Sequence, residues 1–243
     1  RLQGEHPVTE MVTGLDLVEL MIKVAAGQKL PLLQKDIQLR GWAIETRIYA
    51  EDPFQGFLPS VGRMERYIEP ADDGVRIDSG IFEGGEVSIF YDPMISKLIT
   101  YGTDRNQAIE KMSNALDSYY IRGVKNNISF LSALIIHPRF ISGNLTTNFI
   151  NEEYPEGFSA NVLSQADMAV FVVTASVIHV IKSIRRTLIS DQLVGHEYSP
   201  LEKLVVITNN SAQEYQLLVS GSDQSYTVDL DGQLFTFETD WCI

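Results

Sequence analysis

The first five residues carry three polar side chains whose types and spacing suit the binding of a small anion. Arg1, Gln3 and Glu5 lie two positions apart, so an extended segment would place all three on one face. A guanidinium is a planar fork that matches a flat oxyanion, and a carboxylate beside that anion can take its proton. The segment predicts an anion site with its own general base. The alternative is a polar edge strand with a solvated ion pair, and so short a pattern by itself favours that alternative.

A second arginine, Arg47, lies in a run with the alternation of a β-strand. Arg47 and Glu45 belong to the set that we expect to face away from the core, and alone they would form an exposed charge pair of little energetic value. The expected inward set is Trp42, Ile44, Thr46 and Ile48.

Residues 1–10, Arg-Leu-Gln-Gly-Glu-His-Pro-Val-Thr-Glu, resemble the signature of the biotin carboxylase module of biotin-dependent carboxylases. The family usually has valine where this chain has Gly4. Residues 41–60, 91–99 and 120–127 resemble further stretches of the module, in the family's order. Together the matches cover about the first 155 residues. Within the family, the sequence of these stretches is most similar to that of the alpha subunits of acyl-CoA carboxylases, above all those of the propionyl-CoA type.

The resemblance implies a ligase that uses ATP and bicarbonate to carboxylate biotin. It assigns Glu5 as the base that deprotonates bicarbonate and Arg1 as the residue that grips this anion. Gln3 and the backbone N–H of Gly4 would complete the bicarbonate pocket. Arg47 would bind biotin and stabilise negative charge on its enolate oxygen.

Three further residues receive weaker roles from the resemblance. Asp92 is a candidate for orienting Arg47 or biotin, and Thr147 and Asn148 match positions near the nucleotide. The implied cofactors are biotin, carried on a lysine outside this chain, and ATP with Mg or Mn in the complete enzyme. The implied partners are the biotin carrier domain, the carboxyltransferase beta subunit and an upstream ATP-binding domain, in the mitochondrial matrix.

Composition excludes several classes of function. A net charge of -13 argues against nucleic acid or an anionic membrane as a general partner. The single cysteine, Cys242, excludes an internal disulfide and a thiolate metal cluster. No pair among the four histidines has the helical spacing of a zinc site, so we expect no metal site in this chain.

The expected fold is α+β, with an antiparallel sheet and packed helices in a biotin carboxylase C-terminal subdomain at residues 1–155. Short strand patterns with turn residues between them favour an antiparallel sheet. We expect Thr13 to cap a helix that carries Asp16 at its third position. Thr103-Asp104 should cap another helix, and a further apolar helix should end before Pro138.

A second domain is expected at residues 156–243. A capping pattern at Ser164 predicts a central helix over about 164–186, and strands follow within about 204–238 with an Asp231-Gly232 hairpin turn. The apolar run 168–181 has fourteen residues, fewer than the roughly twenty of a membrane span, so we expect no span. The order of these elements, one helix followed by strands, loosely resembles that of the barrel-like domain that links the carboxylase to the transferase. Four strands would leave that barrel incomplete, and we therefore interpret the chain as a fragment.

Two alternatives stay open. The first is that the chain is a non-catalytic subunit-assembly module. The second is that it is the same module from a methylcrotonyl-CoA or other acyl-CoA carboxylase. An assembly module has no need of Arg1, Glu5 and Arg47 together, whereas the carboxylases share them. Within that family pattern, Gly4 predicts a looser bicarbonate pocket, because glycine adds backbone freedom and removes side-chain packing.

We expect the isolated chain to be inactive. It contains no glycine-rich phosphate loop and no lysine between methionines of the carrier type. A phosphate-release assay with ATP and bicarbonate should show no rate above the protein-free blank. Bicarbonate-dependent ATP hydrolysis by this chain would contradict the assignment of the nucleotide site to an upstream domain.

Overall fold

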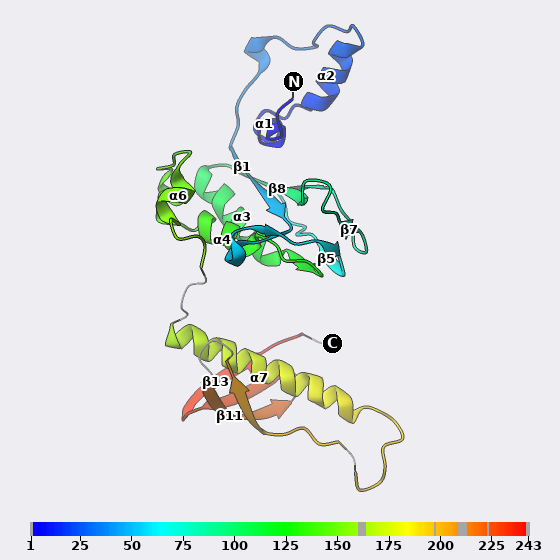
Figure 1. Cartoon of the computed structure of the whole chain (residues 1–243), viewed down its shortest axis with the longest axis vertical. Helices are drawn as coiled ribbons and strands as arrows, with labels where there is room; N and C mark the ends of the chain where they lie inside the picture. Colours follow the sequence, from blue (N-terminus) through cyan, green and yellow to red (C-terminus); the bar gives the residue numbers. More distant parts are fainter. Residues whose placement is uncertain (1, 160–163, 197, 209–212, 223, 242–243) are drawn as a thin grey trace. The chain divides into compact units, whose positions relative to one another are not determined.

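The computed structural model describes residues 2–159, 164–196, 198–208, 213–222 and 224–241. The chain divides into two compact units, Arg1–Ala160 and Asn161–Ile243 (Figure 1). Both units combine antiparallel strands with helices, so the predicted α+β class is confirmed.

A three-stranded antiparallel sheet forms the centre of the first unit. Its strands are β1 (Trp42–Tyr49), β8 (Met94–Gly102) and β6 (Val75–Ser79), in the order β1-β8-β6. Short strand pairs extend around it: β2 (Glu51–Asp52) with β3 (Leu58–Pro59), β4 (Gly62–Arg63) with β7 (Glu86–Val87), and β5 (Arg66–Ile68) with β9 (Tyr120–Arg122).

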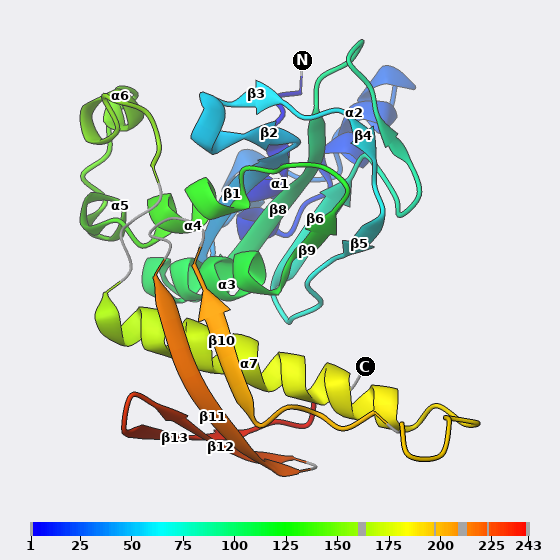
Figure 2. The ribbon, with the colours of Figure 1, turned by 60° about the horizontal axis from the view of Figure 1, so that its bottom comes forward.

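The core of this unit lies between the sheet and helix α3 (Arg105–Ser118) (Figure 2). Asp104 caps α3 by accepting a hydrogen bond from the Gln107 N–H, as the sequence predicts. Ile48 of β1 and Leu98 of β8 are fully buried. The buried stripe of α3 consists of Ala108, Ile109, Met112, Ala115 and Leu116.

The expectation that Trp42 faces the core is wrong, since 49% of this residue is exposed. Trp42 is the first residue of an edge strand and lies opposite Gly102, which offers no side chain to pack against. Thr46 and Ile48, farther along the strand, are buried as predicted.

The opening segment is not extended up to Glu5, because Gly4 and Glu5 form a turn and a helix begins at His6. Helix α1 (His6–Thr13) follows a turn at Gly4 and Glu5, and Pro7 suits its first turn. Gly14, at φ 71°, ends α1. Helix α2 (Leu17–Ala25) is capped by Asp16, which accepts from the Glu19 N–H, so the prediction of a Thr13 cap was wrong.

The remaining helices of the first unit are short. Helix α4 ends before Pro138, as expected from the clash that proline imposes on a preceding helical residue. Their bounds are α4 (Ile128–Ile135), α5 (Pro138–Ser142), α6 (Phe149–Glu153), and the 3₁₀ turns η1 (Gln34–Asp36) and η2 (Pro53–Gln55).

The second unit consists of helix α7 (Gln165–Thr187) packed on one antiparallel sheet (Figure 1). Ser164 caps α7 by accepting from the Asp167 N–H, and the helix bounds agree with the prediction to within a residue. Asp231 and Gly232 both have positive φ, the backbone of a tight hairpin turn. The strands, in sheet order, are β10 (Lys203–Ile207), β11 (Glu214–Ser222), β12 (Ser225–Leu230) and β13 (Gln233–Glu238).

Helix α7 has 23 residues and is, by length and composition, long and apolar enough to cross a membrane. The count of fourteen apolar residues therefore underestimated the length of this apolar helix. The core helix of a sheet passes the same test. Val173 and Val177 are buried in a cluster with Leu217 and Val228 of the strands. This packing, rather than the length, favours the interpretation as a sheet-covered core helix.

We expect Leu98→Ala to destabilise the chain by about 2–5 kcal/mol, because it leaves a cavity in a close-packed core. Leu58→Ala, at a position that is 57% exposed, serves as the control and should change stability by less than about 0.5 kcal/mol. Urea unfolding of both variants measures the difference. Equal midpoints would contradict the placement of Leu98 in the core.

Candidate functional site

The face of the β1-β8-β6 sheet that points away from α3 carries a row of charges. The register sets Arg47 of β1 opposite Lys97 of β8, and Lys97 opposite Asp78 of β6. Helix α1 lies against this face, on the other side of the sheet from α3 (Figure 2). Arg47 therefore lies on a charged sheet face against which α1 packs.

Glu5 and Arg47, which the sequence predicts to share a site, are in direct contact. Arg47 Nη2 donates to Glu5 Oε1 over 2.8 Å, although 42 positions separate the two residues. Their side chains are 38% and 64% exposed, so the pair contributes little to stability. The contact with Tyr49, followed by the nearby carboxylates Glu5 and Glu45, raises the pKa of Arg47, which stays charged.

The turn before α1 forms a hollow beside this pair. Gln3 and Glu5 line a space of about 390 Å³ together with apolar and polar side chains of α1 and α2. Lys97 Nζ donates to the Gly4 carbonyl over 3.1 Å and so ties the turn to β8. A Cβ at Gly4 would lie 2.8 Å from Arg47 Nη2, so the family's valine would require the guanidinium to move. Arg1, the predicted bicarbonate grip, lies outside the described residues.

A partly buried ion network ties the two N-terminal helices to the sheet. Glu10 accepts from Arg76 Nη1 over 2.7 Å and from the Leu17 N–H at the start of α2 over 2.8 Å. Burial alone would raise the pKa of Glu10, but Arg76 and the Leu17 N–H bring it below its ordinary value. Arg76 also binds Asp78, which lies 3.6 Å from Lys97. The signal in the sequence was Glu10 at the end of the opening motif.

Glu45 differs from its expected place in an exposed charge pair. Its side chain is only 6% exposed, and its Oε1 lies 3.8 Å from Arg47 Nε. Its Oε2 has no hydrogen-bond partner among the described residues. Burial raises the pKa of Glu45, opposed by the positive charges of Lys97 and Arg47.

Asn127 holds the backbone of β1 on both sides of Ile48. Its Oδ1 accepts from the Tyr49 N–H over 2.9 Å, and its Nδ2 donates to the Arg47 carbonyl over 3.1 Å. The β1-β8 register shifts between Ile48 and Tyr49, and the Asn127 amide satisfies backbone groups beside that irregularity. The sequence offered Asn127 only as part of a family-like stretch.

The three weaker predictions are not joined to the pair. Asp92 Oδ1 accepts from the Met94 N–H, and Asn148 Nδ2 donates to Glu152 Oε1. Within the described part of the chain, no hydrogen bond or ion pair links Asp92, Thr147 or Asn148 to Arg47 or Glu5. Their roles stay predictions.

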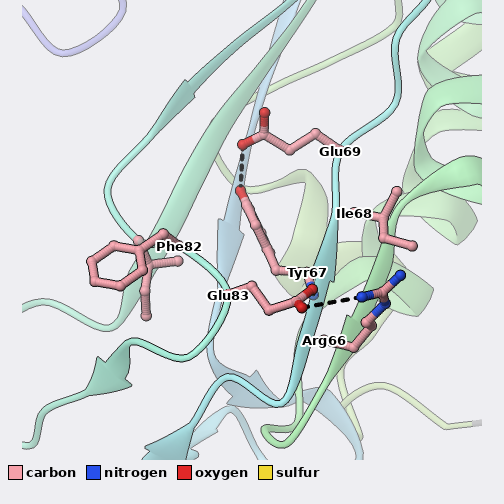
Figure 3. Close-up of a pocket in the computed structure, with 7 residues that line it drawn as sticks. Arg66, Tyr67, Ile68, Glu69, Phe82 and Glu83 are labelled. Atoms are coloured by element: carbon pink, nitrogen blue, oxygen red, sulfur yellow. Dashed lines mark hydrogen bonds and ion pairs between the residues drawn. The ribbon is translucent and has the colours of Figure 1, made fainter.

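A second hollow, of about 460 Å³, contains none of the predicted site residues (Figure 3). Arg66 pairs with Glu83 across it over 3.1 Å. The Tyr67 hydroxyl is hydrogen-bonded to Glu69, and burial raises the pKa of Tyr67, so this phenol stays protonated. The described residues contain no group of three or more His, Cys, Asp or Glu side chains that could hold a metal ion.

Three family models match the chain in consecutive order. Residues 1–33 match the ATP binding domain of the carbamoyl-phosphate synthase L chain. Residues 45–152 match the biotin carboxylase C-terminal domain, and this range contains most of the sheet, Arg47 and Asn127. Residues 171–243 match the propionyl-coenzyme A carboxylase BT domain, which contains most of α7 and its strands.

Relatives along nearly the whole chain are propionyl-CoA carboxylase alpha chains. The Ruegeria pomeroyi protein is 44% identical over 99% of this chain and 38% of its own length. The human mitochondrial protein is 45% identical over 99% of this chain and 32% of its own length. The mouse methylcrotonoyl-CoA carboxylase subunit alpha is 48% identical, over 64% of this chain. The chain spans about a third of the length of the propionyl-CoA carboxylase relatives.

Solved biotin carboxylase structures match about two thirds of the chain. The biotin carboxylase subunit of a pyruvate carboxylase superposes with a TM-score of 0.64 at 44% identity, over 67% of this chain and 36% of its own. The biotin carboxylase domain of a thermophilic 2-oxoglutarate carboxylase, bound to bicarbonate, gives 0.63 at 42% identity, over 66% and 36%.

We expect Asn127→Ala to lower the free energy of unfolding by about 1–3 kcal/mol, because the Arg47 carbonyl and Tyr49 N–H lose a buried partner. Asn114→Ala, at an exposed position on α3, is the matched control and should change stability by less than about 0.5 kcal/mol. Denaturant unfolding measures both variants, and amide exchange at Tyr49 should become faster in the first. An unchanged Tyr49 exchange rate would contradict the backbone-holding role.

Proposed function

Because the chain belongs to the biotin-dependent carboxylases, we propose that it is part of an ATP-dependent biotin carboxylase within an acyl-CoA carboxylase alpha subunit. The reaction is the ligase step that carboxylates carrier-bound biotin with bicarbonate. The observation that carries the proposal is the contact between Glu5 and Arg47, which unites a base and a permanent cation from two family-like stretches.

In the proposed site, Glu5 takes the proton of bicarbonate. It lines the hollow with Gln3, and 64% of its side chain is accessible to a small anion. Arg1 is proposed to grip the anion, and the Gly4 N–H to complete the pocket.

Arg47 is proposed to face the oxygen of biotin's ureido ring, where negative charge develops. Nη2 of its guanidinium donates to Glu5, and the side chain stays 38% exposed. Other N–H donors of the guanidinium therefore remain for a ligand. When bound, biotin supplies the nitrogen that accepts the carboxyl group. Asp92 is proposed to lie on the biotin side, and Thr147 and Asn148 on the nucleotide side.

The two domains are proposed at residues 1–155 and 156–243. The first would supply the carboxylation site together with an ATP-binding domain that holds ATP and its Mg or Mn. One solved relative of this module is in complex with MgADP and bicarbonate. The second would link the carboxylase to the biotin carrier domain and to the carboxyltransferase beta subunit.

Propionyl-CoA is the proposed acyl acceptor of the complete enzyme. The supporting observation is that the propionyl-CoA carboxylase relatives match along 99% of the chain, whereas the methylcrotonoyl-CoA relative matches along 64%. Several of these relatives are named as mitochondrial, which supports the mitochondrial matrix as the location.

In the full-length protein, we expect Arg47→Ser to lower ATP-dependent carboxylation of biotin by about 100-fold or more, because the developing charge loses its preorganised cation. Assembly with the transferase subunit, measured by size-exclusion chromatography, should not change. Arg105→Ser, on α3, is the control and should keep the carboxylation rate. A variant at Arg47 with the normal rate would leave the assembly-module alternative as the better explanation.

A further inference from the structure

The proposed function places a conflicting demand on Arg47. Its shortest contact with a carboxylate is the 2.8 Å hydrogen bond to Glu5, yet Glu5 loses its negative charge when it accepts the proton of bicarbonate. A charge-assisted hydrogen bond then becomes a weaker, neutral one. Arg47 needs a second anionic partner if its guanidinium is to keep its position at that moment.

Glu45 lies where such a partner is needed. It is two residues from Arg47 on the same strand, so both side chains project from the same sheet face. Its Oε1 lies 3.8 Å from Nε of Arg47, whereas Glu5 contacts Nη2. The two carboxylates therefore approach different nitrogens of one guanidinium.

Burial makes Glu45 a costly residue for structure alone. Its side chain is 6% exposed, and its Oε2 lacks a hydrogen-bond partner among the described residues. A buried carboxylate with an unsatisfied oxygen is destabilising unless nearby cations compensate. An isosteric amide would fill the same space without that charge.

The charges around Glu45 come from every element packed on this face. Arg47 of β1 and Lys97 of β8 attract it, and Glu5 and Asp78 of β6 repel it. The other titratable side chains that pair on these elements include Arg76 of β6 and His6 and Glu10 of α1. Neutralising Glu5 removes one repulsion, so Glu45 is favoured as an anion at the step at which Arg47 needs it.

We propose that Glu45 is a positioning residue that holds the Arg47 guanidinium through its Nε edge while Glu5 is protonated. Glu45 touches neither bicarbonate nor biotin in this proposal. It acts by keeping Arg47 aimed at the biotin oxygen through the part of the cycle in which the Glu5 contact is weak. The inference rests on the proposed function of Glu5 and Arg47.

The test is Glu45→Gln in the full-length protein, with two assays. ATP-dependent carboxylation of free biotin should fall by about 100-fold in kcat/KM, with KM for biotin raised, because a guanidinium displaced by about 1 Å costs that much. Bicarbonate-dependent ATP hydrolysis without biotin should stay within about two-fold of wild type, since that step does not use Arg47 as a biotin ligand. Glu110→Gln, on the exposed side of α3, is the matched control for removing one carboxylate.

Glu45→Asp separates positioning from folding. This variant keeps the charge on a shorter side chain and should recover part of the lost biotin carboxylation, whereas a purely structural role would show equal losses in both assays. Wild-type rates for Glu45→Gln, or equal loss of both activities, would overturn the proposal. If Glu45→Gln does not fold, as judged by its Tm, the decision rests on Glu45→Asp: a raised KM for biotin with intact ATP hydrolysis supports it, and any other pattern overturns it. Failure of the proposed function itself would be distinct, because wild-type protein would then not carboxylate biotin.

Discussion

The antiparallel pairing of β1 with β8 is the constraint on which the first unit depends. It directs Ile48 and Leu98 toward α3, where they are fully buried, and Arg47 and Lys97 to the opposite face. Because side chains alternate along a strand, a slip of one residue would bury Arg47 and expose Ile48. Asn127 helps to secure the register, since its amide bonds to β1 backbone groups at Arg47 and Tyr49.

The outer face of that sheet combines charges of two kinds. Glu10 and Arg76 are bound in a network that also takes up the first turn of α2, and this network is structural. Glu5 is mostly exposed and Arg47 partly exposed, so their ion pair contributes little to folding, and the role proposed for them is ligand binding. Glu45 has a buried side chain on the same face, and its Oε1 lies 3.8 Å from Arg47 Nε.

The second unit is built on a different principle. A single helix, α7, buries valines against an antiparallel sheet whose strands follow one another in chain order. Consecutive strands pair through short connections, and the Asp231-Gly232 turn supplies the positive φ that such a connection needs. Residues 171–243 of this unit match the propionyl-coenzyme A carboxylase BT domain.

Local features were open to prediction from the sequence. The helix from Ser164 onward, the turn at Asp231-Gly232 and the buried stripe of α3 depend on capping, φ preference and periodicity, which act over a few residues. The family-like stretches of the sequence likewise indicate Glu5 and Arg47 as candidate site residues.

What depends on distant segments was decided by the tertiary structure alone. The sequence patterns did not predict α1, so Glu45 was expected to be exposed. Its side chain is in fact buried, on the sheet face against which α1 packs. It placed Trp42 in the core, although the edge of the sheet offers it nothing to pack against. Alternation states which residues share a face, but only the packing of other elements states whether that face is covered, and that is why the charged surroundings of Arg47 could not be read from the chain.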